Sequence, residues 1–375
     1  MTRTVGVEEE LLLVDALTMQ PAPVAGDIMR DPAGGDGPVR ARSAPGLVPG
    51  ALLELEVAHE QIEVVSPPLL TLADLRSAVV TGRRAADEAA RTVGARAVAV
   101  ATSTVPCAPH AVAGDRYDRM RERFGLTAAE QLTCGFHVHV SVTSPDEGVA
   151  VLDRLRPWLP VLLALSANSP FWQGEDTAFA SYRYQAWGRW PSAGAYDVHE
   201  SAVRYAQTLA EMLAAEVTLD AGMVYFDARL SAHAPTVETR IADVCLLPGD
   251  AAVVAVLVRA LVETAAAEWR AGVPVDPVPT SMLRLASWRA SRSGLEDDLL
   301  HPVTHRPCPA ADVVEALLRH VRDGWADEGE RAEAERGVRD ILRRGTGAAR
   351  QRRVMACAGS CEAVLADLAD ATLDG

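Results

Sequence analysis

Several short stretches of the chain alternate hydrophobic and polar residues, a pattern typical of β-strands that bury one face. From Val5 to Asp15, β-compatible apolar residues flank three glutamates. From Thr133 to Val142, every second residue is apolar. Extended structure is therefore expected at residues 5–15, 52–65, 97–104, 133–142, 224–230 and 236–244.

Longer segments follow the helical pattern. Thr71, with Asp74 three residues later, forms an approximate capping box for a helix that runs to about Val93. The apolar segment 250–271 predicts a long buried helix, and further helical segments are expected at 127–131, 147–166, 200–216 and through most of the last hundred residues. The Pro- and Gly-rich stretch 21–50 is expected to be a long mobile loop.

The order of these elements predicts the fold class. Strands and helices alternate over 375 residues, and neither an internal repeat nor a linker-like composition divides the chain. The chain is 49% hydrophobic and 23% charged, which is near the average for folded globular proteins. We therefore expect a single α/β (α+β) domain over residues 1–375, with a helical C-terminal portion.

Composition excludes several kinds of chemistry. The chain has 36 arginines and a combined Lys+Arg count of 36, so it contains no lysine. A Walker A phosphate loop, a pyridoxal-phosphate Schiff base and a lysine nucleophile are therefore all excluded. The net charge of −15 makes a nucleic acid partner unexpected, because phosphate binding requires a basic surface.

The N-terminus and the apolar runs bear on the cellular compartment in which the protein is expected. The chain begins Met1-Thr2-Arg3-Thr4 and lacks the apolar core of a secretory signal, so a cytoplasmic protein is expected. The apolar run 251–262 is far shorter than the roughly 20 residues that cross a bilayer, so no membrane partner is expected. The six cysteines include no CxxC pair, and reduced thiols are expected.

Charged residues on the predicted strands supply the candidate chemistry. Glu8 and Glu10 share one strand face, and two adjacent carboxylates repel each other unless a cation lies between them. His137 and His139 likewise share a face, opposite an apolar one. A solvated edge for the glutamates and a structural role for the histidines are the alternatives.

Two further pairs extend this pattern. Glu238 and Arg240 share a strand face, where a simple cross-strand ion pair is the alternative. Glu56 and Glu63 fall on opposite faces of an ideal strand, so they converge only through a bulge or bend. Carboxylates from several elements, together with one or two histidines, describe a site for Mg²⁺ or Mn²⁺. Arginines close to such a site fit phosphoryl transfer to a carboxylate.

Eight segments form an ordered set of motifs along the chain: Gly6–Glu10, Glu56–Glu63, Cys134–Val140, Ala164–Trp172, Ala180–Arg183, Thr236–Arg240, Trp288–Leu295 and Ala349–Arg352. Taken in this order, they resemble the type-2 glutamate-cysteine ligase family, the carboxylate-amine ligases related to glutamine synthetase. The resemblance extends over nearly the whole chain.

The resemblance implies a fold and a reaction. The fold is glutamine-synthetase-like, with a curved, mainly antiparallel sheet that holds ATP and divalent cations and is flanked by helices. In the family reaction, ATP activates a carboxylate, typically the γ-carboxylate of glutamate, as an acyl phosphate. An amine such as cysteine then attacks it to give an amide, ADP and phosphate.

The resemblance also implies roles for residues. The ligands of the metal nearer the acyl acceptor are Glu10, Glu56 and Glu63, with Glu54 as an alternative. The ligands of the metal that bridges the nucleotide phosphates are Glu8, His137 and Glu238. His139, Arg229 and Arg352 are expected to contact ATP, Arg240 to stabilise the transferred charge, and Arg183 to bind the substrate carboxylate.

Other functions stay open at this point. A metal-dependent amidohydrolase would use the same cluster to activate water, without ATP. A non-catalytic nucleotide-binding homologue would retain the fold alone. The sequence does not identify the amine, which could be cysteine, another amino acid or a small amine. It does not identify the oligomeric state either, and a homodimer is one alternative.

Overall fold

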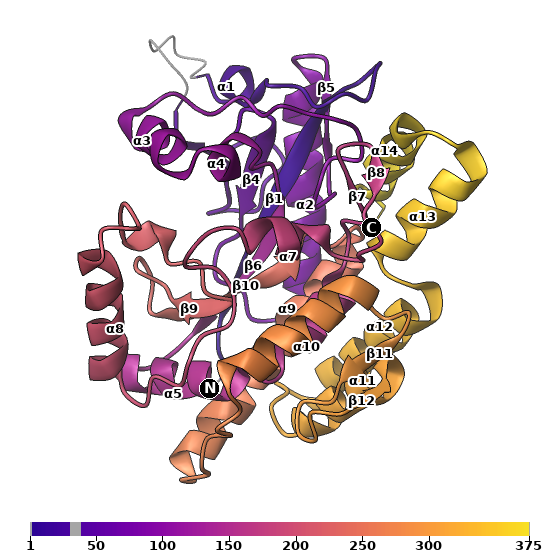
Figure 1. The fold of residues 1–375 in the computed structure, drawn as a ribbon. Helices are drawn as coiled ribbons and strands as arrows, with labels where there is room; N and C mark the ends of the chain where they lie inside the picture. Colours follow the sequence, from indigo (N-terminus) through magenta and orange to yellow (C-terminus); the bar gives the residue numbers. More distant parts are fainter. Residues whose placement is uncertain (1, 31–38, 375) are drawn as a thin grey trace.

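The computed structural model describes residues 2–30 and 39–374, and its centre is an eight-stranded sheet (Figure 1). The strand order is β2-β3-β4-β1-β6-β10-β9, with β5 also paired to β1, and the pairings within this sheet are antiparallel. Its strands are β1 (Val5–Asp15), β2 (Ala41–Arg42), β3 (Leu52–Leu55), β4 (Gln61–Val65), β5 (Ala95–Val98), β6 (Gly135–Ser141), β9 (Ala228–Leu230) and β10 (Thr236–Asp243). Two small hairpins add β7 (Phe171–Trp172) with β8 (Glu175–Asp176), and β11 (Asp298–Leu300) with β12 (Pro307–Pro309).

Helices cover the sheet and continue beyond it. Those in the first two thirds of the chain are α1 (Ala25–Ile28), α2 (Leu72–Arg91), α3 (Asp115–Phe124), α4 (Leu126–Ala129), α5 (Pro145–Leu155), α6 (Leu159–Ser166), α7 (Tyr182–Trp187), α8 (Ala202–Ala214) and the 3-10 helix η1 (Ala221–Met223). The later ones are α9 (Pro248–Arg270), α10 (Thr280–Ser293), α11 (Ala310–His320), α12 (Glu328–Arg344), α13 (Gly347–Ala358) and α14 (Cys361–Ala371). The last four lie along one side of the molecule (Figure 1). The expected helical C-terminal portion is confirmed.

Strand alternation places the larger hydrophobic cluster on one side of β6 and β10. Val138 and Val140 of β6 are buried together with Val237 of β10, and they join a hydrophobic cluster with residues of α5, α6 and α9. The core also contains a buried ion pair. Glu9 points away from Glu8 and Glu10, and its carboxylate lies 2.6 Å from the guanidinium of the fully buried Arg83 of α2. The opposite face is polar around Glu8, Glu10, His137 and His139, whereas Leu12 and Val14, farther along that face of β1, are buried in a second hydrophobic cluster.

Most expected elements are confirmed, with local corrections. The Thr71 hydroxyl caps α2 by accepting a hydrogen bond from the backbone N–H of Asp74. The expected helix at 147–166 is wrong as a single helix: it divides into α5 and α6 around Trp158, where Pro160 in the first turn of α6 lacks a backbone N–H. The strand expected at 97–104 ends at Val98.

The largest correction concerns residues 52–65, which were expected to form one extended segment. They form a hairpin instead, in which β3 pairs with β4 and places Glu54 opposite Glu63. The stretch 21–50 is not simply a loop, because it contains α1 and β2; its residues 31–38 lie outside the described part of the chain.

In the part of the chain that the structure describes, no helix combines the length and the apolar character needed to cross a membrane.

Candidate active site

Predicted site residues lie side by side on the polar face of the sheet. Residues directly opposite each other in antiparallel strands point to the same face. Glu10 of β1 lies opposite Glu63 of β4, and Glu8 of β1 lies opposite His137 of β6. The His137 imidazole Nδ1 is 3.0 Å from a Glu8 carboxylate oxygen. The Glu10 carboxylate accepts a 2.6 Å hydrogen bond from the backbone N–H of Gly135.

The same face continues across β6, β10 and β9. His139 lies opposite Glu238, and Glu238 lies opposite Arg229. Nε2 of His139 is 3.1 Å from a second Glu8 oxygen, so Glu8 lies between the two histidines. Arg229 donates to both Glu238 oxygens, at 2.6 and 3.3 Å, and Arg240 also pairs with Glu238.

The hairpin of β3 and β4 brings Glu56 to this face. Counted along one continuous strand, Glu56 and Glu63 point in opposite directions. In the hairpin, Glu54 lies opposite Glu63, and side chains opposite each other point to the same face. Glu56, two residues after Glu54, points to that face as well. Glu54 lines the same cavity as the other two but belongs to none of the ligand groups found among the described residues.

Three overlapping groups of side chains place ligand atoms within 4.8 Å of one another. The first group, Glu10 with Glu56 and Glu63, is the one predicted for the metal nearer the acyl acceptor. The second predicted set, Glu8 with His137 and Glu238, does not occur as one group. The register of β6 with β10 places His139 rather than His137 opposite Glu238. The structure groups Glu8 with His139 and Glu238, and Glu8 with Glu63 and His137.

Glu56 and Glu63 of the first group form no ion pair with any described residue, and the charge of Arg240 only partly offsets the effects that raise the pKa of Glu56. Burial, reinforced by the charge of Glu10, raises the pKa of Glu56 to about 8. Burial, reinforced by Glu56 and Glu8, raises the pKa of Glu63 well above its usual value. Carboxylates in this condition are suited to a divalent cation, which removes the repulsion between them.

Glu8 and Glu238 are balanced by neighbours. Burial alone would raise the pKa of Glu8, but hydrogen bonds with His137 and His139 outweigh it and hold the pKa far below the usual value. Burial opposes ionisation of Glu238 as well, yet Arg240 and Arg229 hold its pKa at about 2. These two carboxylates are therefore ionised at neutral pH.

The two histidines differ in charge balance. Burial would lower the pKa of His139, but its hydrogen bond with Glu8 and the charge of Glu8 raise it. Burial and the charge of Arg240 lower the pKa of His137, so this imidazole is neutral at pH 7. Nε2 of His137 is buried and has no hydrogen-bond partner among the described residues. A neutral ring with a free nitrogen fits a metal ion. The donor set of carboxylate oxygens and imidazole nitrogens thus fits Mg²⁺ or Mn²⁺.

A cavity of about 890 Å³ contains these side chains. Nine of the eleven predicted site residues line it: Glu8, Glu10, Glu56, Glu63, His137, His139, Arg229, Glu238 and Arg240. Arg183 is buried beside β6 without lining the cavity. Arg352 of α13 is engaged elsewhere, because it donates to both carboxylate oxygens of Asp176 at 2.7 and 3.0 Å.

Sequence reasoning missed the wall of the cavity that faces the sheet. Arg116 of α3 pairs with Asp220 at 2.7 Å, and both line the cavity with Tyr117 and Tyr225. No motif marks these residues, since α3 and the segment before η1 are more than 100 positions apart. Only the proximity of the two segments in the fold reveals them.

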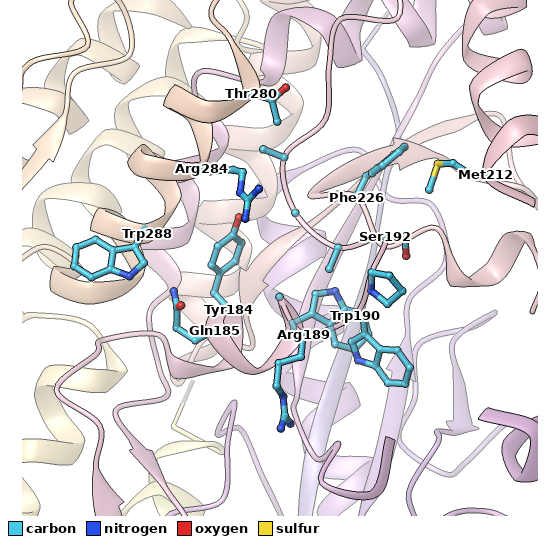
Figure 2. Close-up of a pocket in the computed structure, with 16 residues that line it drawn as sticks. Tyr184, Gln185, Arg189, Trp190, Ser192, Met212, Phe226, Thr280, Arg284 and Trp288 are labelled. Atoms are coloured by element: carbon cyan, nitrogen blue, oxygen red, sulfur yellow. The ribbon is translucent and has the colours of Figure 1, made fainter. Parts of the chain in front are cut away.

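A second cavity of about 550 Å³ lies beyond Trp187, which lines both cavities. Figure 2 shows Tyr184 pointing toward Arg284 of α10, with Trp288 on the same helix and Trp190 on the other side. Among the described residues that line it, none is an aspartate or glutamate. The acidic ligand groups thus belong to the larger cavity.

Comparison with known proteins gives consistent matches. The model of the family described as glutamate-cysteine ligase family 2 (GCS2) matches residues 4–367. A Paenarthrobacter aurescens protein named "Putative glutamate--cysteine ligase 2-1" is 55% identical over 350 residues, which cover 93% of this chain and 90% of the relative. A Streptomyces coelicolor protein with a corresponding name is 47% identical over 364 residues, which cover 97% of each chain.

Solved structures show the same fold. A Francisella tularensis glutamate–cysteine ligase, solved in complex with AMP, has a TM-score of 0.65 at 12% identity and covers 100% of this chain and 90% of that one. A bifunctional glutathione synthetase from Pasteurella multocida has a TM-score of 0.68 at 16% identity. This chain, 99% covered, spans about half (52%) of that protein. The expected fold class is confirmed.

Proposed function

The chain belongs to glutamate-cysteine ligase family 2 and is an ATP-dependent ligase that forms carbon–nitrogen bonds; we propose that it joins the γ-carboxylate of glutamate to an amine. Its substrates are small molecules, and we propose that the whole chain forms one catalytic domain. The observation that carries the proposal is the row of carboxylates and histidines in one cavity.

Two neighbouring ligand groups support the use of divalent cations. Glu10, Glu56 and Glu63 would hold one cation, and Glu8 with Glu238 and a histidine would hold another. Bound there, such cations would neutralise the charge of the transferred phosphoryl group. The donor set is oxygen-rich, which favours Mg²⁺ or Mn²⁺ over a four-ligand zinc site.

The arginines of the cavity have separate tasks in this proposal. Arg229 and Arg240 flank Glu238, where they would contact the phosphates and stabilise transferred charge. His139 lies on the same part of the face. Arg183 would bind a carboxylate of the acid. Arg352 would contact nucleotide only by releasing Asp176, so it is the weakest member of the predicted set.

The proposal is tested by ADP release from purified protein with ATP, Mg²⁺ and glutamate, across a panel that includes cysteine, other amino acids and small amines. ADP release that requires an amine and yields an amide is the expected result, and it identifies the amine. Turnover of an amide without ATP would instead establish an amidohydrolase. ATP binding without ADP release for any amine would point to a carboxylate other than glutamate, and absence of ATP binding as well would favour the amidohydrolase or a non-catalytic homologue.

Variants of the ligands locate the chemistry. Glu10→Ala and His137→Ala should each abolish ADP formation while the far-ultraviolet circular dichroism stays unchanged, because both side chains face the cavity rather than the core. Glu88→Ala, on the exposed side of α2, is the matched control and should retain full activity. Activity retained in both ligand variants would refute the metal assignment.

A further inference from the structure

Gly135 occupies the first position of the ligand row on β6. Residues 135, 137 and 139 point to the same face of the strand, and His137 and His139 line the large cavity. At position 135 the row has no side chain. The backbone of Gly135 is not among those with a positive φ, so its conformation alone does not require glycine.

The guanidinium of Arg183, from α7, fills the place of the missing side chain. A Cβ on Gly135 would lie 2.3 Å from Nη2 and 3.0 Å from Cζ of Arg183. It would also lie 3.1 Å from Nε2 of His137. Real Cβ atoms do not approach other atoms as closely as 2.3 Å, so any larger residue at position 135 displaces this arginine.

Arg183 is a buried cation that forms no salt bridge in the part of the chain that the structure describes. Its charge acts on the buried Asp243 and Asp227, whose pKa values it lowers against the effect of burial, and its guanidinium lies 5.9 Å from the centre of the Trp187 ring. Its exposed fraction is 2%. Its only side-chain hydrogen bonds among the described residues are long ones, at 3.4 Å, to the backbone carbonyls of Ile241 and Arg240, and its Nε has no partner there. Burying an unpaired charge is unfavourable unless an anion joins it. The arginine is therefore prepared for an anionic ligand next to His137.

We infer that Gly135 is a positioning residue, whose lack of a side chain admits Arg183 to the ligand face and thereby creates the binding point for a carboxylate of the acid substrate. This inference rests on the proposed function. Gly135 would thus contribute to specificity for the acid substrate without a side chain of its own, through the space that it leaves for Arg183. The backbone N–H of Gly135 donates to Glu10, and alanine would retain that bond.

The chain offers a matched control for Gly135→Ala. Gly6 of β1 lies opposite His139 and lines the same cavity, and a Cβ there would come no closer than 3.9 Å to any neighbour. Because a Cβ at position 6 meets its neighbours at ordinary contact distance, Gly6→Ala should change the KM for glutamate far less than Gly135→Ala does. Gly135→Ala should raise the KM for glutamate by about 10- to 100-fold while the KM for ATP changes by less than about twofold. In thermal unfolding with Mg²⁺ and ADP, it should also lose the stabilisation by glutamate that the wild type shows.

A double-mutant cycle separates a positioning role from general damage to the strand. If Gly135 acts through Arg183, the alanine should have less than about a threefold effect in an Arg183→Gln background. Should Gly135→Ala fail to fold, the double variant decides: folding restored by Arg183→Gln supports the inference, and failure of both overturns it.

The remaining outcomes are distinguishable. A wild type without glutamate-dependent ADP release refutes the proposed function itself. An active wild type whose Gly135→Ala variant matches Gly6→Ala in both the KM for glutamate and the thermal shift overturns the inference alone. A KM for ATP that rises in parallel with that for glutamate would also overturn it, because it would indicate a general distortion of the site.

Discussion

Replacing Glu56 by glutamine should stabilise the protein in the absence of metal. Glu56 follows β3, and burial together with Glu10 raises its pKa to about 8. In the unfolded chain the carboxyl ionises near its usual value of 4.5. Between these two pH values the unfolded state loses a proton that the folded state retains, so folding becomes less favourable as the pH rises. Glutamine has the same shape and no charge to lose.

The magnitude follows from the two pKa values. Between pH 4.5 and pH 7, the free energy of unfolding of the wild type should fall by about 3 kcal/mol because of Glu56, at roughly 1.4 kcal/mol per pH unit. Rearrangement of Glu10 and Glu63 in the wild type would reduce this, so a gain of about 1 to 3 kcal/mol is expected. The unfolding entropy of a chain of this length is about 0.8 kcal/mol/K, which places the rise in Tm at roughly 1 to 4 °C.

The assay is thermal unfolding in EDTA at pH 5, 7 and 8, followed by the same series with Mn²⁺. The gap between Glu56→Gln and the wild type should be small at pH 5 and widen toward pH 8. Added Mn²⁺ should stabilise the wild type more than the variant, because the variant lacks one ligand. Glu88→Gln, which removes an equal charge from the exposed side of α2, should show neither effect.

Two results would refute the reasoning. If Glu56→Gln melts below the wild type in EDTA at pH 8, crowding of the carboxylates does not destabilise the metal-free fold. If Mn²⁺ stabilises both proteins equally, Glu56 is not a ligand, whatever its effect on folding.

Three further predictions concern stability. Arg3 holds the pKa of Glu147 at about 2 through an ion pair at 2.8 Å, so Glu147→Gln should lose roughly 2 to 3 kcal/mol in urea unfolding at pH 7 and little at pH 2. Gly347→Ala would place a Cβ 2.0 Å from Oδ1 of Asn168, and a loss of about 1 to 3 kcal/mol is expected in the same assay. Val138→Asp would bury an unpaired charge in the core and should abolish cooperative unfolding as followed by circular dichroism.

Controls make these three predictions specific. Gly249→Ala adds a Cβ with no atom within 4 Å and should be nearly neutral beside Gly347→Ala. Val138→Thr is the milder core change, and it should still unfold cooperatively. An equal loss of stability in Glu147→Gln at pH 7 and pH 2 would show that the ion pair contributes nothing, since protonation of Glu147 should remove the pair from the wild type.

Local pattern determined several features of this protein in advance. Period-two alternation predicted β1 and β6 and the shared face of Glu8 with Glu10 and of His137 with His139, because strand side chains alternate regardless of what surrounds the strand. The capping box at Thr71 predicted the start of α2 for the same reason, since a cap depends on residues a few positions apart. The ordered motifs were enough to indicate the family.

Features that depend on pairing between distant segments required the tertiary structure. The hairpin turn between β3 and β4 brings Glu56 to the face of Glu63, contrary to what a continuous strand implies. The register of β6 with β10 decides which histidine lies beside Glu238.

The position of Arg183 depends on an even longer-range contact. Its guanidinium occupies the space left by Gly135, 48 positions earlier in the chain, and the sequence alone presents these two residues as unrelated. Local rules specify which way a side chain points from its own strand or helix. They do not specify which strands meet or in what register, because burial of the whole core decides that. The sequence by itself therefore determined the elements and the chemical types of the site, and the packing of the core decided which of those residues meet.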